Sequence, residues 1–517
     1  MTKAAIAAVT KAGFIIIAAI ADNRINRNMF TELCGGILKP CIPNPFNTNI
    51  PLFLMFDSVH ILKVLRNIWL NQKTKDTTLF FPSFENFDEI MEASFDDLRN
   101  IHYSEKNEIV KMAPKLNEKA LFPSSVERQN VNLCLRIFHE SNMHALTMLD
   151  EVKYKGTITF LHIIIKWWKI ASIKNTRKGY EKLDHDSVPF SCVNDARIKF
   201  LSCLSSWLKE WQKKEIPGFK RNQGKLTSET FFAFQHTVQA LTDVIKYLIS
   251  EKKDKFVLTG KFQTDNLEGR FGQYRQLNGG NYNLSVDQVL KSEKKLRITS
   301  LLKLRSESYG EMPISDFMAD FSEKIDTEQG NDMEENNYKF ELKGFVDNIQ
   351  FENEEDIPQS IYISGYAVHQ LKKKLHCSSC IKMLSTEKSL VLENDNSSHN
   401  YFNLVEKGGL MYPNEFTTRV FLLCLKVFKC VLKRDNEHLL LTDNVKKILT
   451  SMTYDKVVEL YVNQCCPSCG EGTHDLSLKC ISIFFNIFLS NYSKVKNNVV
   501  HSSCQKRKYD MLMASIQ

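Results

Sequence analysis

The chain has 517 residues, of which 43% are hydrophobic and 25% charged, and its formal net charge is +8. This balance is typical of globular proteins and excludes a fibrous or wholly disordered chain, while the length predicts about three or four compact units. The modest positive charge is compatible with a nucleic-acid partner without requiring one.

Two apolar runs near the start of the chain predict buried strands that each end on an aspartate. A short helix at about 3–11 leads into the first run, Gly13–Ala21, and the second run is Pro51–Phe56. The first run also resembles a secretory signal, because a lysine precedes it and it ends in small residues. Lys11 and Gly13 interrupt the apolar stretch, which falls well short of the roughly 18 residues of a membrane span. We therefore favour a strand, and we expect no membrane-spanning segment.

The middle of the chain changes to helical periodicity. From about residue 85 to residue 258, apolar residues recur at helical spacing and no run is convincing as a strand. The clearest predicted helices are Val131–Leu149, Ile198–Gln212 and Thr227–Ile249. We therefore predict an all-helical block.

Three further segments follow this block. Residues 259–306 hold a Gly- and Asn-rich turn and a basic amphipathic helix, Lys291–Arg305. Residues 307–360 are acidic and polar, which predicts a loosely ordered linker. Residues 361–517 are apolar enough to form a second helical unit, with a frayed end.

One short motif carries a specific family resemblance. The segment Asp265–Gly272 reads D-N-L-E-G-R-F-G and is followed by the turn Asn278–Asn281. It is similar to the D-x-L-E-x-x-F-G segment of P-element-type transposases and the related THAP-domain transposases. In that family the glutamate is the last member of a catalytic acidic triad, so the resemblance implies a catalytic role for Glu268. Without the resemblance, Glu268 reads equally as an exposed helical glutamate.

Two earlier segments match the same family in the same order. The stretch Ala18–Phe30 resembles the strand and loop that carry the second catalytic aspartate, which implies that role for Asp22. Residues 54–67 resemble a D-x-x-H-L-x-K-x-x-R-N element, with Ile61 in place of its leucine, and point to Asp57 and His60 as supporting residues. The alternative for Asp22 is a turn-forming Asp-Asn pair after a strand.

The resemblance implies a mixed α/β and α fold. A partial RNase H-like α/β domain (1–84) would be interrupted by a large helical insertion domain (85–258) and resumed in 259–306. The acidic linker (307–360) and a mainly helical C-terminal region (361–517) would follow. Asp22 and Glu268 would bind Mg²⁺, which prefers carboxylate oxygens and in paired sites clamps the attacking and leaving oxygens at about 3.5–4 Å separation.

The family also needs a first aspartate on an earlier strand, and a zinc-containing DNA-binding module before it. We expect this chain to lack both, because in the family they precede the helix that leads to Asp22. With Asp22 and Glu268 alone we expect weak metal affinity and impaired DNA cleavage, because a metal site depends on its number of ligands. Whether this chain is an enzyme is left open.

The helical block resembles the insertion domain that binds GTP in these transposases. Phe190, Ser191 and Asn194 match an F-D-x-x-N-x-R pattern in which Ser191 replaces an aspartate and the arginine, Arg197, comes one residue late. A serine cannot accept from both guanine donors as a carboxylate does. Asp265 lies where the family has another nucleotide- or metal-associated acid. The alternative is an ordinary helix start with Asn194 exposed.

The 14 cysteines are spread through ordinary helical sequence, which favours a reducing compartment. In the C-terminal region, Gly365, Tyr366 and Leu371 followed by Cys377 and Cys380 resemble a G-Y-x-x-x-x-L…C-x-x-C element of the family. A second pair, Cys466 and Cys469, could complete a Zn²⁺ site. Its separation far exceeds that of a compact zinc ribbon, so buried or free thiols are the alternative.

The resemblance implies DNA of the transposon-end type as partner, a nuclear location, and no membrane, and it is compatible with a homo-oligomer. Two segments are candidates for DNA contact, Lys166–Lys169 with its two tryptophans and the helix Lys291–Arg305. Three functions remain open: a metal-dependent transposase, a domesticated DNA- or protein-binding remnant without catalysis, and a nucleotide-responsive regulator.

Overall fold

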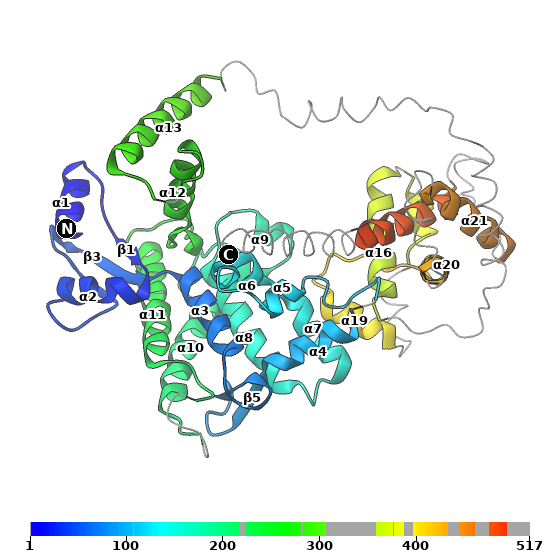
Figure 1. The fold of residues 1–517 in the computed structure, drawn as a ribbon, viewed down its shortest axis with the longest axis horizontal. Coiled ribbons are helices and arrows are strands. Elements are labelled where there is room, and N and C mark those ends of the chain that lie inside the picture. Colours follow the sequence, from blue (N-terminus) through cyan, green and yellow to red (C-terminus); the bar gives the residue numbers. More distant parts are fainter. Residues whose placement is uncertain are drawn as a thin grey trace, which may run out of the picture.

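The protein is described from a computed structural model. The described residues are 2–106, 108–216, 223–281, 283–306, 358–375, 377–386, 397–432, 445–460 and 475–493. Within them the fold is mostly helical, with five short strands in two small sheets. This confirms the expected mixture of helices with a minor strand component (Figure 1).

The first sheet has the strand order β1-β3-β2. β1 (Ala18–Ala21) runs parallel to β3 (Asn47–Phe56), and β2 (Cys41–Asn44) runs antiparallel to it. The predicted strand Gly13–Ala21 is too long, because the paired residues of β1 begin at Ala18. Phe14 and Ile15 before it are 67% and 64% exposed. The predicted strand at Pro51–Phe56 is confirmed and is longer.

Helices frame this sheet. α1 (Thr2–Lys11) precedes β1, α2 (Asn23–Leu33) follows it, and α3 (Ser58–Leu70) follows β3. The last five residues of β3 are all buried, as a continuous apolar run predicts for a strand covered on both faces.

The second sheet corrects the prediction of an all-helical block after residue 85. β4 (Thr78–Pro82) pairs antiparallel with β5 (Ile90–Ser94). In β5, Met91 and Ala93 are buried while their neighbours are more exposed, a two-residue alternation too short to be convincing in sequence. The predicted boundary at 84/85 falls inside the loop of this hairpin.

Three tryptophans from two helices, α3 and α10, bond the hairpin to the helical body. The indole nitrogens of Trp207 and Trp211 donate to the carbonyl oxygens of Pro82 (2.7 Å) and Phe80 (2.6 Å), and Trp69 donates to Ala93 (3.0 Å). The buried apolar residues from Ile6 to Val257 form one continuous core. The strands near the start and the helices up to residue 257 therefore pack as one body.

The helices of this body largely follow the predicted segments. α10 (Ala196–Lys213) and α11 (Ser228–Ser250) match two of them, but Val131–Leu149 is split into α6 (Val131–Ile137) and α7 (Glu140–Asp150). His139 makes the break, because its ring accepts from the Ser141 amide and caps α7. The remaining helices are α4 (Phe95–Ser104), α5 (Glu118–Leu121), α8 (Lys155–Ala171) and α9 (Lys178–Glu181), with 3₁₀ turns at Lys75–Thr77, Glu127–Gln129, His185–Ser187 and Thr259–Lys261.

Two helices follow the body, α12 (Asp265–Leu277) and α13 (Val286–Ser306), the latter containing the predicted basic helix. The predicted linker lies almost wholly outside the described residues. Beyond it come α16 (Ser360–Lys374), α17 (Ser378–Lys382), α19 (Ser397–Val405), α20 (Glu415–Leu432), α21 (Val445–Leu460) and a helical stretch over 476–493.

These C-terminal helices enclose a second core, which Val110 of the first body joins. Gly365 of α16 packs closely against the segment before α20. A Cβ on Gly365 would lie 2.2 Å from the Met411 carbonyl oxygen. Lys407 pairs with Glu140 of α7 at 3.0 Å, and the Tyr401 hydroxyl donates to the Met112 carbonyl at 3.3 Å. Within the described part of the chain, every helix is too short or too polar to cross a membrane.

Candidate functional site

Asp22 and Asp57 follow neighbouring strands at the same edge of the first sheet. β1 and β3 are parallel and in register from Ala18 opposite Phe53 to Ala21 opposite Phe56, so their carboxyl ends coincide. The Asp57 amide continues the pairing by donating to the Ala21 carbonyl at 3.0 Å. Each aspartate then begins a helix, Asp22 before α2 and Asp57 before α3.

Asp57 joins this edge to α12. Its Oδ2 accepts from the His60 amide at 3.1 Å and its Oδ1 from the Thr264 amide at 3.4 Å, the residue just before α12. The side chain is 1% exposed, and burial raises the pKa of its carboxyl while the backbone hydrogen bonds oppose that rise. At His60 it is the backbone amide that makes this contact. Asp57 therefore positions helices with both of its oxygens.

Unlike Asp57, Asp22 and Glu268 have carboxylates that accept no hydrogen bond from a helix start in the part of the chain that the structure describes. Asp22 is exposed and makes no side-chain cap to α2. Glu268 is exposed in the first turn of α12, and Asp265 in the same turn forms an ion pair with Lys174. No three His, Cys, Asp or Glu side chains gather into a metal-holding group within the described residues. The oxygen ligands of Asp22 and Glu268 are of the type that Mg²⁺ prefers.

Two residues of α11 that the sequence reading missed complete the edge of β3. β2 begins opposite Phe53, and the Pro40 carbonyl just before it accepts from the Leu54 amide at 2.9 Å, so β2 offers no partner to the Leu54 carbonyl or the Phe56 amide. The ring of His236 donates from Nε2 to the Leu54 carbonyl at 2.9 Å, and Thr237 Oγ1 accepts from the Phe56 amide at 3.0 Å. Burial lowers the pKa of His236 to about 4, so the ring is neutral. In sequence both read as ordinary helix residues.

The start of α12 is also held by the end of α8. The Gly260 amide donates to the Ile173 carbonyl at 2.8 Å, and Gln263 Nε2 donates to the Ala171 carbonyl at 3.1 Å. Thr259 Oγ1 donates to the Ile170 carbonyl. The turn that carries Glu268 is thus fixed from two sides, by β3 through Asp57 and by α8.

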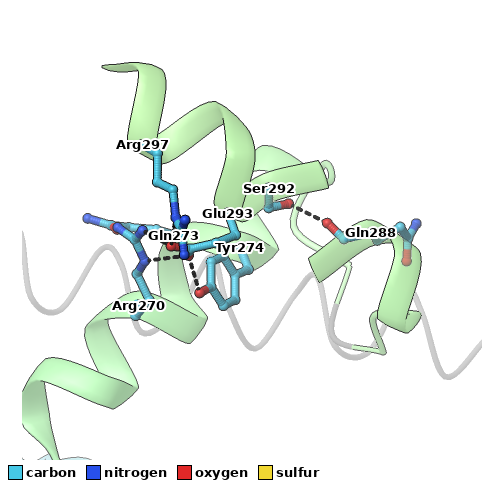
Figure 2. Close-up of polar contacts among 7 residues, drawn as sticks. All are labelled: Arg270, Gln273, Tyr274, Gln288, Ser292, Glu293 and Arg297. Atoms are coloured by element: carbon cyan, nitrogen blue, oxygen red, sulfur yellow. Dashed lines mark hydrogen bonds and ion pairs between the residues drawn. The ribbon is translucent and has the colours of Figure 1, made fainter. Parts of the chain in front are cut away.

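A carboxylate on α13 clamps α13 to α12. Glu293 accepts from the Tyr274 hydroxyl at 2.6 Å and from Arg270 at 2.8 Å, and it also pairs with Arg297 at 3.1 Å (Figure 2). Hydrogen bonds from Tyr274, Arg297 and Arg270 lower the pKa of Glu293 to about 2. The clamp leaves Lys291 and Lys294 of α13 exposed.

Residues in and beside the predicted nucleotide motif make contacts within the fold. Phe190 is fully buried and bridges to Val257 in a two-residue β-bridge, while the Arg197 guanidinium lies 4.0 Å from the centre of its ring. Asp195 accepts from Arg197 side-chain nitrogens and caps α10. Ser191 and Asn194 are exposed. Asp195, which is not one of the predicted nucleotide-binding residues, is thus paired with an arginine, and GTP binding stays a prediction.

The candidate DNA contact at Lys166–Lys169 is wrong for two of its residues. Trp167 is fully buried, with its ring 4.5 Å from that of Phe234, so it cannot stack on a base. Lys169 forms ion pairs with Glu140 and with Asp184 at 3.1 Å. An apolar helix core explains this segment.

Only one of the two predicted cysteine pairs lies within the described residues. Cys377 directly precedes α17, and Cys380 within α17 is fully buried in the second core. Cys466, Cys469 and the neighbouring His474 lie outside the described residues. The shared Zn²⁺ site therefore stays a prediction.

Comparison with known proteins agrees with the family that the motifs indicate. Residues 342–494 match the family model described as DNA transposase THAP9, C-terminal domain. The Transposable element P transposase of Drosophila melanogaster is 22% identical over 460 residues, which cover 84% of this chain and 54% of that protein. The chain therefore spans about half the length of this curated relative. The resemblance to P-element-type transposases is confirmed.

One solved structure is similar as well. It is the Drosophila P element transposase strand transfer complex, with a TM-score of 0.47 and 15% sequence identity. The match covers 56% of this chain and 62% of that one.

Proposed function

Because this chain is related to the P-element-type transposases, we propose that it is a nuclear DNA-binding protein of the transposition machinery. Its sheet β1-β3-β2 would be part of an RNase H-like domain. In that domain Asp22 and Glu268 are the carboxylates that face the DNA backbone, and transposon-end DNA is the partner.

One observation carries this proposal. The Asp57 carboxylate bonds to the Thr264 amide and so brings the edge of β1 and β3 to the first turn of α12. The three sequence segments that match the family in order thereby meet at one place, although Thr264 comes 207 positions after Asp57. Asp22 and Glu268 remain exposed at this meeting point.

The two carboxylates would hold Mg²⁺, which would supply charge neutralisation at a scissile phosphate. Two carboxylates provide only part of the octahedral oxygen shell that Mg²⁺ takes. We therefore propose weak metal binding and slow cleavage by this chain alone, with cleavage and strand transfer as activities of the complete assembly.

A second function, DNA binding without cleavage, is favoured by the state of Asp57. Asp57 is the third carboxylate at this edge of the sheet. Both of its oxygens accept from backbone amides, and its side chain is buried. A domesticated remnant would keep Asp57 for stability and would tolerate loss of Asp22 or Glu268.

The test uses the full chain with labelled terminal-repeat DNA and either Mg²⁺ or Mn²⁺. Fluorescence anisotropy measures binding and gel electrophoresis measures cleavage, for the wild type, Glu268→Gln, and the control Glu251→Gln on an exposed position after α11. We expect all three to bind DNA with little cleavage. Robust cleavage that is lost only in Glu268→Gln would overturn the proposed impairment, and absence of DNA binding would overturn the function itself.

GTP is proposed as a ligand on the family resemblance alone and has a separate test. Calorimetric titration of GTP is compared for the wild type and Asn194→Ala. Equal affinity in the two proteins would remove Asn194 from any nucleotide site.

A further inference from the structure

A short basic loop lies next to the start of α12. Residues 174–182, here named the α9 loop, carry Lys174, Arg177, Lys178 and Lys182 against the single acid Glu181. All four basic residues are exposed. Lys174 pairs with Asp265, whereas the side chains of the other three form no ion pair with another described residue. The loop therefore presents three unneutralised cations to solvent.

Local hydrogen bonds give this loop a fixed shape. The Asn175 side chain accepts from the amides of Arg177 at 2.7 Å and Lys178 at 3.1 Å. The Asp184 amide donates to the Gly179 carbonyl at 2.9 Å, and a Cβ on Gly179 would lie 2.5 Å from the Ser187 carbonyl oxygen. The backbone folds back on itself here, so the backbone positions that carry the cations are fixed before any ligand binds.

The same loop is anchored to the turn that carries Glu268. It begins directly after Ile173, whose carbonyl accepts from Gly260 and whose amide donates to Thr259 Oγ1 at 3.4 Å. The Lys174–Asp265 ion pair then links it to the first turn of α12. The other three cations follow Lys174 by three, four and eight residues in the same loop.

A polyanion is the ligand that such a surface fits. Duplex DNA carries about one negative charge per 1.7 Å of axis, and lysine and arginine side chains that neutralise phosphates release its condensed counterions. Contacts to phosphates fix the position of DNA without reading sequence. A carboxylate site that acts on DNA also needs nearby cations to offset repulsion between its acids and the phosphates.

We propose that Arg177, Lys178 and Lys182 of the α9 loop contact the DNA phosphodiester backbone and hold it beside the first turn of α12. The inference rests on the proposed DNA-binding function and adds a surface to it. It assigns to this loop a role that Trp167 and Lys169 do not fill, because Trp167 is buried and Lys169 is ion-paired.

The test compares two triple variants of the full chain. Arg177→Ala/Lys178→Ala/Lys182→Ala removes the loop cations. Lys75→Ala/Lys209→Ala/Lys213→Ala removes three exposed cations from the turn before β4 and from α10, whose Trp211 donates to Phe80 of β4. The hairpin β4–β5 lies at the other end of α8, where Gly156 packs on Glu92 (Figure 1). Both variants lower the net charge by the same amount. Circular dichroism checks that each keeps the wild-type helical content.

The probe is a short fluorescein-labelled DNA duplex titrated at several salt concentrations. We expect the slope of log K against log salt to fall by about 0.9 for each lost phosphate contact in the loop variant, and to stay at the wild-type value in the control. An unchanged slope and affinity in the loop variant, with wild-type binding intact, would overturn this inference alone. Equal losses in both variants would overturn it too, and a wild type that binds no DNA would overturn the proposed function.

Discussion

The Asp57 carboxylate accepts from the Thr264 amide at 3.4 Å, joining residues 207 positions apart. Its other oxygen accepts from the His60 amide and caps α3. One buried side chain thus fixes the end of β3, the start of α3 and the start of α12 relative to each other. The positions of Asp22 and Glu268 both depend on it.

Replacing Asp57 by Asn should destabilise the protein. The Asn amide has one acceptor oxygen where Asp57 uses two, so either the α3 cap or the Thr264 contact is lost. We expect about 1–3 kcal/mol of lost unfolding free energy, the usual cost of an unsatisfied buried group. Urea unfolding measures it. The exposed Asp88, replaced by Asn, should leave the midpoint within experimental error, and an equal loss there would contradict the assignment.

His236 should make stability depend on pH. Burial lowers its pKa to about 4, below the ordinary value of 6.5, so between these values the unfolded chain binds more protons than the folded one. The stabilisation is complete above about pH 6.5 and decreases as pH falls toward 4, with a slope of at most about 1.4 kcal/mol per pH unit from this histidine.

The variant His236→Gln separates this effect from other titrating groups. Its amide can still donate to the Leu54 carbonyl but does not ionise. The difference in unfolding free energy between wild type and variant, measured by urea unfolding at a series of pH values, should change between pH 6.5 and 4. A constant difference would show that His236 is not buried as a neutral donor.

Glu293 should control the order of α13. It accepts from Tyr274, Arg270 and Arg297 together (Figure 2). Glu293→Gln weakens charge-assisted hydrogen bonds, so the amides of α13 should exchange with deuterium faster while those of α11 do not change. Asp287→Asn, which removes only an exposed i,i+4 pair with Lys291, is the matched control. Equal protection in Glu293→Gln and wild type would refute the clamp.

Glu140 should couple the C-terminal helices to the first body. Although burial alone would raise the pKa of Glu140, hydrogen bonds and charges from Lys169 and Lys407 lower it to about 2. Glu140→Gln should loosen the contact with Lys407, and hydrogen exchange should increase over residues 401–411. Lys169 keeps Asp184 as a partner, so α8 should stay protected. Unchanged exchange in 401–411 would mean that the apolar contacts alone hold the two parts together.

Much of this architecture could be predicted from sequence, for identifiable reasons. β3 is a continuous apolar run that ends on a helix-capping aspartate, and α10 and α11 have long helical periodicity. β5 could not be predicted, because five residues containing Glu92 give too short an alternation. The break before α7 depends on one histidine side chain capping a helix, a contact that periodicity does not record.

The sequence predicted the acidic residues of the candidate site but not the hydrogen bonds that bring them together. The family resemblance marked Asp22, Asp57 and Glu268, but it gave no sign that Asp57 would be the residue that binds the start of α12. His236 and Thr237 were missed because their role is to satisfy backbone groups of a strand about 180 residues earlier. Such partners are set by tertiary packing alone.

The most direct measurement of the central claim is binding of Mn²⁺, followed by electron paramagnetic resonance, to the full chain. The wild type is compared with Asp22→Asn, Glu268→Gln and the double variant, with Glu251→Gln as control. If Asp22 and Glu268 share one metal site, each single variant weakens binding and the double variant is little worse than either. Mn²⁺ affinity that is the same in all five proteins would contradict a shared site.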